Sequence, residues 1–153
     1  MDQTKKNTIA VLKNLLKICK DEHSLFQAAA DNCSDLKLKS SLIQYAKNKD
    51  NYASKLKCEI KRLGENPDLP DNTTDKISFM SFNGMNYTQN EVLLQCINTD
   101  SITIQKYSSA IKEDILWEVI PLVAKQYFDS INLHDQMINL IKPVQNKSML
   151  VVA

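Results

Sequence analysis

Residues 7–33 read NTIAVLKNLLKICKDEHSLFQAAADNC. Apolar side chains recur in this stretch at alternating intervals of three and four residues, which is the period of a helix that packs against other helices. His23 is the one polar residue on the resulting seam. The seam consists of Ile9, Leu12, Leu16, Cys19, His23, Phe26, Ala30 and Cys33. The stretch therefore predicts a long amphipathic helix that turns one ionisable side chain towards the core.

The same pattern returns three times further along the chain. We predict helices over residues 4–31, 35–63, 89–112 and 115–142, because an apolar seam of the same period runs through each range. In each of the three later seams an ionisable residue stands where an apolar one is expected. These residues are Lys49, Asp100 and His134. Four such helices can bury one shared core, so the sequence predicts an all-α four-helix bundle in a single domain over residues 1–153.

The connections predict the directions in which the helices run. A short connection separates the first two helices, so they should be antiparallel, with Ser34 as the N-cap of the second. Gly64 should end the second helix in a left-handed conformation. Residues 64–88 then form a long crossover with a short helix expected at about 75–85. This crossover makes the second and third helices parallel.

Three residues mark the starts of the last two helices. Thr88 and Glu91 have the spacing of a capping box at the start of the third helix. Pro121 lies in an early turn of the predicted fourth helix, where it removes a hydrogen bond and bends the helix entry. We interpret the single tryptophan, Trp117, as a packing residue near the start of the same helix.

Composition and charge limit the functional classes. A formal net charge of +1 argues against nucleic-acid binding, which needs a basic field. No segment approaches the ~20 consecutive apolar residues of a membrane-spanning helix. The four cysteines stand singly, which is typical of a reducing cytoplasm. We therefore expect a cytoplasmic protein that binds neither nucleic acid nor a membrane. A homo-oligomer could form through an exposed helix face or through the apolar tail at 143–153.

The polar residues of the four seams are expected at similar depths in the bundle. At ~1.5 Å of rise per residue, they lie roughly 10 to 21 Å below the end that carries the first loop. A buried charge costs several kcal/mol unless it is paired. We therefore predict that these side chains satisfy one another in a structural polar layer. The predicted layer consists of His23, Tyr45, Lys49, Asp100, Tyr127 and His134.

Two other interpretations of this layer stay open. A single metal ion could be held by His23, Asp100 and His134, and Glu22 or Cys96 would then lie nearby. The chain has no Glu-x-x-His motif, however, and di-iron bundles use that motif on two of their helices. A small-ligand pocket beside Asp100 and His134 is the third interpretation. We assign no cofactor-binding and no metal-ligating residue.

Catalysis by a cysteine has one candidate pair. Cys19 and His23 lie one helical turn apart, and no other thiol and imidazole have this spacing. Both stand on the predicted buried seam, and buried cysteines are inert. We assign no catalytic residue and predict that the protein is not an enzyme.

Several stretches carry a family resemblance. They are residues 14–21 (NLLKICKD), 26–30 (FQAAA), 45–56, 106–111 (KYSSAI) and 126–135. With these residues the chain resembles an uncharacterised bacterial family of ferritin-like four-helix-bundle proteins, the domain of unknown function 2383, over residues 7–142. The resemblance implies a ferritin-like bundle with the long crossover between the second and third helices. The family name leaves the activity unassigned.

The chain departs from the pattern of this family at three places. Where the family tends to have a Glu-Arg-Gly-Glu run in the third helix, residues 97–100 read INTD and keep one acid. The family's arginine in the second helix is Lys49 here, which holds the charge without the bidentate fork. Residues 21–22 read Asp-Glu in place of Asp-Gly. If family members use paired acids for a metal, this chain has lost part of the set.

Two functional hypotheses follow from these observations. The first is a non-catalytic helical bundle that acts as a binding or scaffolding module, with the polar layer serving packing specificity. The rival is a metal-binding or redox and stress-related protein of the ferritin-like superfamily. Elemental analysis of the purified protein separates the two.

Overall fold

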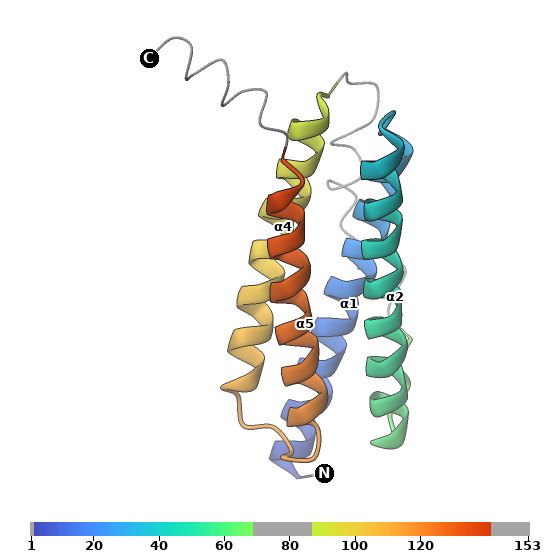
Figure 1. The fold of residues 1–153 in the computed structure, drawn as a ribbon. Coiled ribbons are helices and arrows are strands. Elements are labelled where there is room, and N and C mark those ends of the chain that lie inside the picture. The colour runs from blue at the N-terminus through green and yellow to red at the C-terminus, as the bar shows by residue number, and fades with distance from the viewer. Residues whose placement is uncertain (1, 69–86, 142–153) are drawn as a thin grey trace.

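The computed structural model describes residues 2–68 and 87–141, and within these ranges it contains four helices and no strands. The helices are α1 (Gln3–Asp31), α2 (Leu36–Arg62), α4 (Gln89–Ile111) and α5 (Ile120–Asn139). They pack side by side as an elongated bundle (Figure 1). The helix at 75–85 and the tail at 143–153 that the sequence predicts lie outside the described residues.

The directions of the helices agree with the prediction. In Figure 1, α1 and α5 run upwards from the end that carries the N-terminus, and α2 and α4 both run downwards. The parallel pair α2 and α4 requires a connection that crosses the length of the bundle. The fold is therefore the predicted ferritin-like arrangement, with the crossover between the second and third helices.

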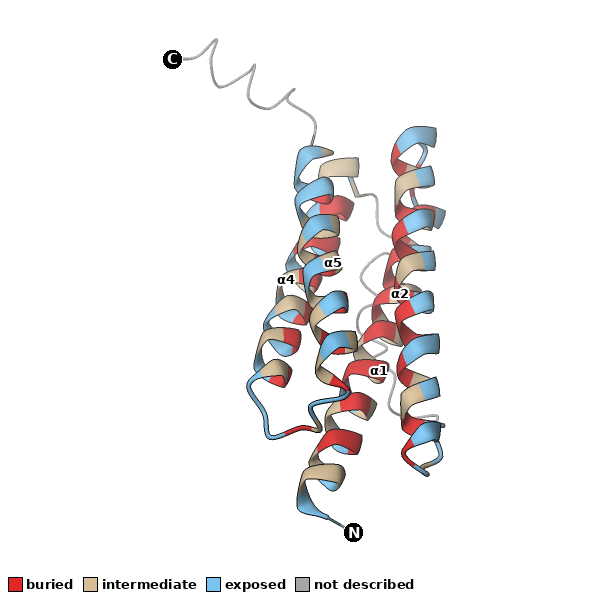
Figure 2. Ribbon diagram, turned by 60° about the horizontal axis from the view of Figure 1, so that its bottom comes forward, coloured by how far each residue is buried: buried red, intermediate tan, exposed pale blue. Residues whose placement is uncertain are grey.

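The apolar core is divided into two parts along the bundle. The part near the α1–α2 loop gathers Phe26, Leu42 and Leu93 with their neighbours, and the part near the N-terminus gathers Leu16, Leu56 and their neighbours. Figure 2 shows the buried residues on the sides of the helices that face one another. A set of buried polar residues lies between the two parts in the sequence of α1, α2 and α4. This set forms the site described below.

The ends of α2 differ in how well the sequence predicts them. The N-cap is Asp35, not Ser34, because the Asp35 side chain accepts hydrogen bonds from the backbone N–H groups of Lys37 and Leu38. At the other end Gly64 has φ +89°, as predicted for a left-handed cap. The Gly64 N–H donates to Lys61 O, and the next N–H donates to the carbonyl of Ile60, which is the Schellman pattern.

The start of α5 is a correction to the sequence prediction. The helix begins at Ile120 rather than at residue 115, so Pro121 falls in its first turn. A proline there costs no helical hydrogen bond, because the first N–H groups of a helix have no partner within it. Trp117 consequently lies in the connecting segment and is 80% exposed, so its interpretation as a packing residue is wrong.

The capping box of α4 gives the first testable prediction. Thr88 Oγ1 accepts from the Glu91 N–H, and a Glu91 carboxylate oxygen accepts from the Thr88 N–H. Replacing Thr88 with alanine should lower the free energy of unfolding by about 1 kcal/mol in urea denaturation, the usual cost of losing an N-cap. Thr88→Ser keeps the hydroxyl and should unfold like the wild type. Equal losses in both variants would contradict a role for the hydroxyl.

Candidate functional site

A lysine ammonium lies at the centre of the bundle. The Lys49 side chain on α2 is 1% exposed, and its Nζ donates to Asp100 Oδ1 on α4 at 3.0 Å. The same nitrogen lies 3.1 Å from Glu22 Oε1 on α1 and 3.5 Å from Ser130 Oγ on α5. Both carboxyl groups are at most 1% exposed. One cation from α2 therefore contacts a polar group from each of the other three helices, and we call these four residues the Lys49 layer.

The helical period explains why these residues meet. Glu22, Lys49 and Asp100 each follow or precede buried apolar residues by three or four positions, so each stands on the inner stripe of its helix. Ser130 lies midway between Val123 and Met137, which are buried on the inner side of α5. Glu22, for example, lies between Cys19 and Phe26, which are both fully buried. The polar layer thus separates the two apolar parts of the core.

Burial and charge set the protonation of the layer. Desolvation by itself lowers the pKa of Lys49, but the neighbouring Glu22 and Asp100 outweigh it and raise this pKa above its usual value. Desolvation raises the pKa of Glu22 to about 8, against the opposing effect of Lys49 and with a further increase from Asp100. The layer therefore combines the Lys49–Asp100 ion pair with a Glu22 carboxyl group that keeps its proton to higher pH than an exposed glutamate does.

Several buried polar atoms at this site have no hydrogen bond within the described part of the chain. They are both carboxyl oxygens of Glu22, Asp100 Oδ2 and His134 Nδ1. Glu22 Oε1 is close to the ammonium but lacks hydrogen-bond geometry. Asp100 Oδ2 and His134 Nδ1 face each other at 3.3 Å. Like the contact of Glu22 with Lys49, this one lies within ion-pair distance but lacks hydrogen-bond geometry.

His134 connects the layer to the surface. Its side chain is 17% exposed, and its Nε2 lies 3.5 Å from Ser101 Oγ. Asp100, His134 and Ser101 thus form a carboxylate, imidazole and hydroxyl series. Ser101 Oγ also donates to Ile97 O at 3.1 Å. Ser101 stands in the middle of α4, where backbone N–H groups are used by the helix, so no pair of N–H groups is free to stabilise an oxyanion.

A second buried polar network lies one level nearer the N-terminal end. Tyr107 Oη donates to Gln126 Oε1 at 2.7 Å and lies 3.1 Å from Cys19 Sγ. Gln126 Nε2 donates to the carbonyl of Tyr52 at 3.3 Å. Burial raises the pKa of the Cys19 thiol to about 11, although Lys49 opposes the shift. Cys19 is therefore a protonated, buried thiol and not a nucleophile.

The sequence prediction of the layer is correct in part. Lys49, Asp100 and His134 come together as predicted. His23 does not join them, because its ring faces α2, with Nδ1 2.8 Å from the carbonyl of Ala46. The preceding residue, Glu22, takes the inner position instead.

The two tyrosines of the predicted polar layer do not lie beside Lys49. Tyr45 packs edge-on against Phe26 at 6.4 Å between ring centroids, within the apolar core. Tyr127 is half-buried and lies against Phe128. The sequence analysis named Glu22 only as a neighbour of a possible metal site, and it assigned neither Ser130 nor Ser101 to the layer. A short polar side chain on a helix gives no signal of its own, because serine is equally common on exposed faces.

The donor set does not fit a metal ion. The three residues of the metal interpretation, His23, Asp100 and His134, are not brought together. Across residues 2–68 and 87–141 no three histidine, cysteine, aspartate or glutamate side chains are arranged to hold one. The space between the two carboxyl groups is taken by the ammonium of Lys49, which has no lone pair to offer.

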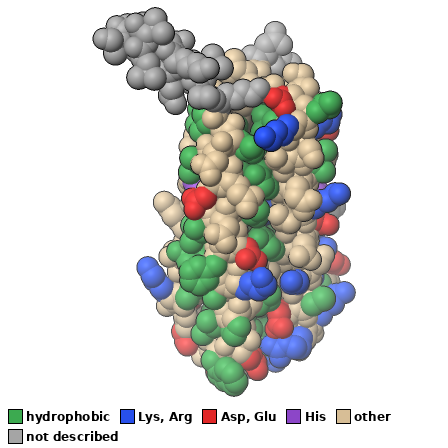
Figure 3. All heavy atoms as spheres, in the orientation of Figure 1, with side chains coloured by type: hydrophobic (Ala, Val, Ile, Leu, Met, Phe, Trp, Pro, Cys, Tyr) green, Lys and Arg blue, Asp and Glu red, His purple; other side chains and the backbone are tan. Residues whose placement is uncertain are grey.

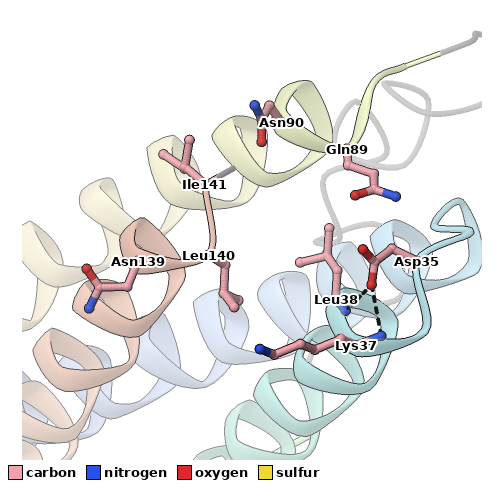
Figure 4. A pocket seen from close by; sticks show the side chains of 8 residues that line it. All are labelled: Asp35, Lys37, Leu38, Gln89, Asn90, Asn139, Leu140 and Ile141. Atoms are coloured by element: carbon pink, nitrogen blue, oxygen red, sulfur yellow. Dashed lines mark hydrogen bonds between the residues drawn. The ribbon is translucent and has the colours of Figure 1, made fainter. Parts of the chain in front are cut away.

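The clearest surface pocket lies away from the Lys49 layer. Figure 4 shows it where the start of α2 faces the start of α4 and the end of α5. It is lined by Asp35, Lys37, Leu38, Gln89, Asn90, Asn139, Leu140 and Ile141. The Asp35 carboxylate in its wall is occupied by the N-cap of α2. No residue of the layer lines this pocket, so it is not the ligand pocket considered beside Asp100 and His134.

Two further expectations can be compared with the described residues. All four cysteines are free thiols, and only Cys58 is exposed. None of the described helices is both long enough and apolar enough to span a membrane.

Comparisons with known proteins place the chain by family and by fold. Residues 7–113, which include most of α1 and all of α2 and α4, match the family described as Domain of unknown function (DUF2383). No curated protein sequence matches the chain. Among solved structures, a mutant of Mycobacterium smegmatis Dps1 is similar, with a TM-score of 0.76 and 12% identity. The match covers 93% of this chain and 99% of that one, and it shows a shared fold.

Proposed function

This chain belongs to the DUF2383 family, and on that premise we propose that it is a non-catalytic ferritin-like helical bundle that acts as a binding or scaffolding module. The family description assigns no activity. The proposal therefore depends on the chemistry of the site, and in the first place on the Lys49 ammonium between two buried carboxyl groups.

The Lys49 layer supports this proposal because its charge is balanced within the chain. The ammonium and Asp100 form an ion pair, and burial raises the pKa of Glu22, which favours the uncharged form of this second carboxyl group. A layer of this kind aligns the helices and needs no external ion to be stable. Binding is then a property of the outer surface of the bundle.

The buried nucleophiles support the same proposal. The Cys19 thiol and the Tyr107 hydroxyl are hydrogen-bonded to each other, and burial raises the pKa of both groups. The hydroxyl of Ser101 lies near an imidazole but has no oxyanion site. None of these groups combines an activated state with a place for a substrate.

Elemental analysis tests the proposal against the rival metal-binding function. The protein is purified without a metal-affinity tag, incubated with Fe²⁺, Mn²⁺ or Zn²⁺, desalted and analysed by mass spectrometry for metals. We expect no stoichiometric ion and no shift of the melting temperature with any of the three. A stoichiometric ion that Asp100→Asn no longer retains would overturn the proposal and place the metal in the layer.

A chemical probe tests the absence of a serine nucleophile. We expect no adduct in the intact mass after incubation with a fluorophosphonate. An adduct on Ser101 that disappears in His134→Gln would show an activated hydroxyl and would contradict a non-catalytic role. Ser109→Ala, on the exposed side of α4, is the matched control.

A further inference from the structure

The outer face of α4 is poor in charge. Between Glu91 and Lys106 the helix exposes no ionised side chain, since Asp100 is buried. Leu94 and Ile102 on this face are 45% and 58% exposed. The exposed stripe steps by four and three residues, as the seam of a packed helix does. Its members are Glu91, Gln95, Asn98, Ile102, Gln105 and Ser109.

The other half of the bundle is different. The exposed surface of α2 carries charged residues along its whole length. They include Lys37, Lys47, Asp50, Lys55, Lys61 and Arg62. In Figure 3 the lysine and arginine side chains gather mostly over the α2 side and the lower end of this view. Depletion of charge with exposed aliphatic residues is the composition of an interface core.

Exposed residues on and beside the α4 stripe are placed nearly symmetrically about Asn98. Leu94 and Ile102 stand four residues before and four residues after it. Glu91 and Lys106 stand seven before and eight after, and they carry opposite charges. If a second α4 lies antiparallel with a two-fold axis at Asn98, each Leu94 reaches the level of the partner's Ile102. Each Glu91 then lies level with the partner's Gln105, one residue away from the partner's Lys106.

We propose that the outer face of α4 is the interface of a homodimer, in which two copies pack their α4 helices antiparallel about a two-fold axis at Asn98. An isologous interface must be complementary to itself. The outer face of α4 meets this condition, because its aliphatic residues face aliphatic residues and its opposite charges lie near each other in the antiparallel pair. The amide of Asn98 both donates and accepts, so at the two-fold axis it can pair with Asn98 of the other copy. The amides of Gln95 and Gln105 can likewise pair with whichever polar group lies level with them. A stripe of one charge sign would repel itself.

The charges at the ends of the stripe favour a second copy over an unrelated partner. Lys106 is exposed, and none of the ion pairs within residues 2–68 and 87–141 involves it. Hydrogen bonds from the backbone and side chain of Thr88 lower the pKa of Glu91, so this carboxylate stays ionised. The two-fold arrangement brings Glu91 of each copy near Lys106 of the other, so two equivalent contacts of opposite charge form. The inference does not depend on the proposed non-catalytic role, since a metal-binding bundle could dimerise in the same way.

Sedimentation velocity of the full chain over a range of concentrations tests the proposal. We expect the wild type to be a dimer and Ile102→Glu to raise the dissociation constant at least tenfold. Leu36→Glu is the control, because Leu36 is an 80% exposed aliphatic residue on α2. Far-UV circular dichroism shows whether each variant is folded. A wild type that stays monomeric would overturn the proposal.

A charge exchange tests the antiparallel register. Glu91→Lys and Lys106→Glu should each weaken the dimer, because each places like charges near each other. The double variant should restore it. A dimer that none of these changes affects, or one that is lost on removing residues 142–153 and kept in Ile102→Glu, would overturn the proposal and place the contact elsewhere.

Discussion

Replacing Lys49 with methionine should lower the free energy of unfolding by about 3–5 kcal/mol at neutral pH, the usual cost of removing one partner from a buried ion pair. Methionine matches the length of the lysine stem, so the loss comes from the charge and not from a cavity. Asp100 then loses its ammonium partner and is left as a buried carboxylate beside Glu22 and the His134 imidazole. Urea denaturation followed by circular dichroism measures the change.

The control for this prediction is Lys47→Met. Lys47 is an exposed lysine on the same helix, and its replacement should change stability by less than about 0.5 kcal/mol. Adding Asp100→Asn to Lys49→Met removes the unpaired charge and should recover part of the loss. If the stability loss of the double variant equals the sum of the losses of Lys49→Met and Asp100→Asn, the pairing of Lys49 with Asp100 is contradicted, because residues in contact are not independent.

The second large effect is a dependence of stability on pH that comes from Glu22. Its pKa rises from 4.5 to about 8 on folding. The folded state therefore binds more protons than the unfolded state between these values. Stability is greatest below the unfolded pKa and falls as the pH rises through the folded pKa. The slope approaches about 1.4 kcal/mol per pH unit where the folded chain holds one proton more than the unfolded chain.

Glu22→Gln isolates this effect, because the amide imitates the protonated acid and does not titrate. Its stability relative to the wild type should increase steadily with pH across the same interval. Denaturation curves of both proteins at several pH values give the difference, and Glu113→Gln on the surface is the control. A Glu22→Gln variant that is less stable than the wild type at every pH would mean that Glu22 is ionised in the folded state.

The fold could be predicted from the sequence because its signals are long and redundant. Four seams of period 3.5 and a capping box at Thr88 were enough to order the helices. The start of α5 could not be read from the seam, since apolar residues continue through Ile115 and Val119 without being helical. Tertiary contacts bury both of these residues in the connecting segment.

The candidate site was harder to predict than the fold. Lys49 and Asp100 stand alone between apolar neighbours, so their inward position was clear. Glu22 and His23 are adjacent and lie only 100° apart around the helix, so a step of three or four residues from Cys19 fits either one. Contacts with the other helices select Glu22. A seam pattern does not contain that information.

The Lys49 ammonium contacts polar groups of the other three helices, and these contacts also restrict how far one helix can shift along its neighbours. Aliphatic seams alone tolerate a shift of one helix by a turn, about 5.4 Å, because leucine would meet leucine again. Such a shift of α2 would strand Lys49 among hydrocarbon side chains and leave Asp100 without its counter-charge. We therefore expect the Lys49 layer to fix the register of the four helices. The layer disfavours arrangements in which a helix is shifted by one turn, so a single alignment of the helices remains as the native state.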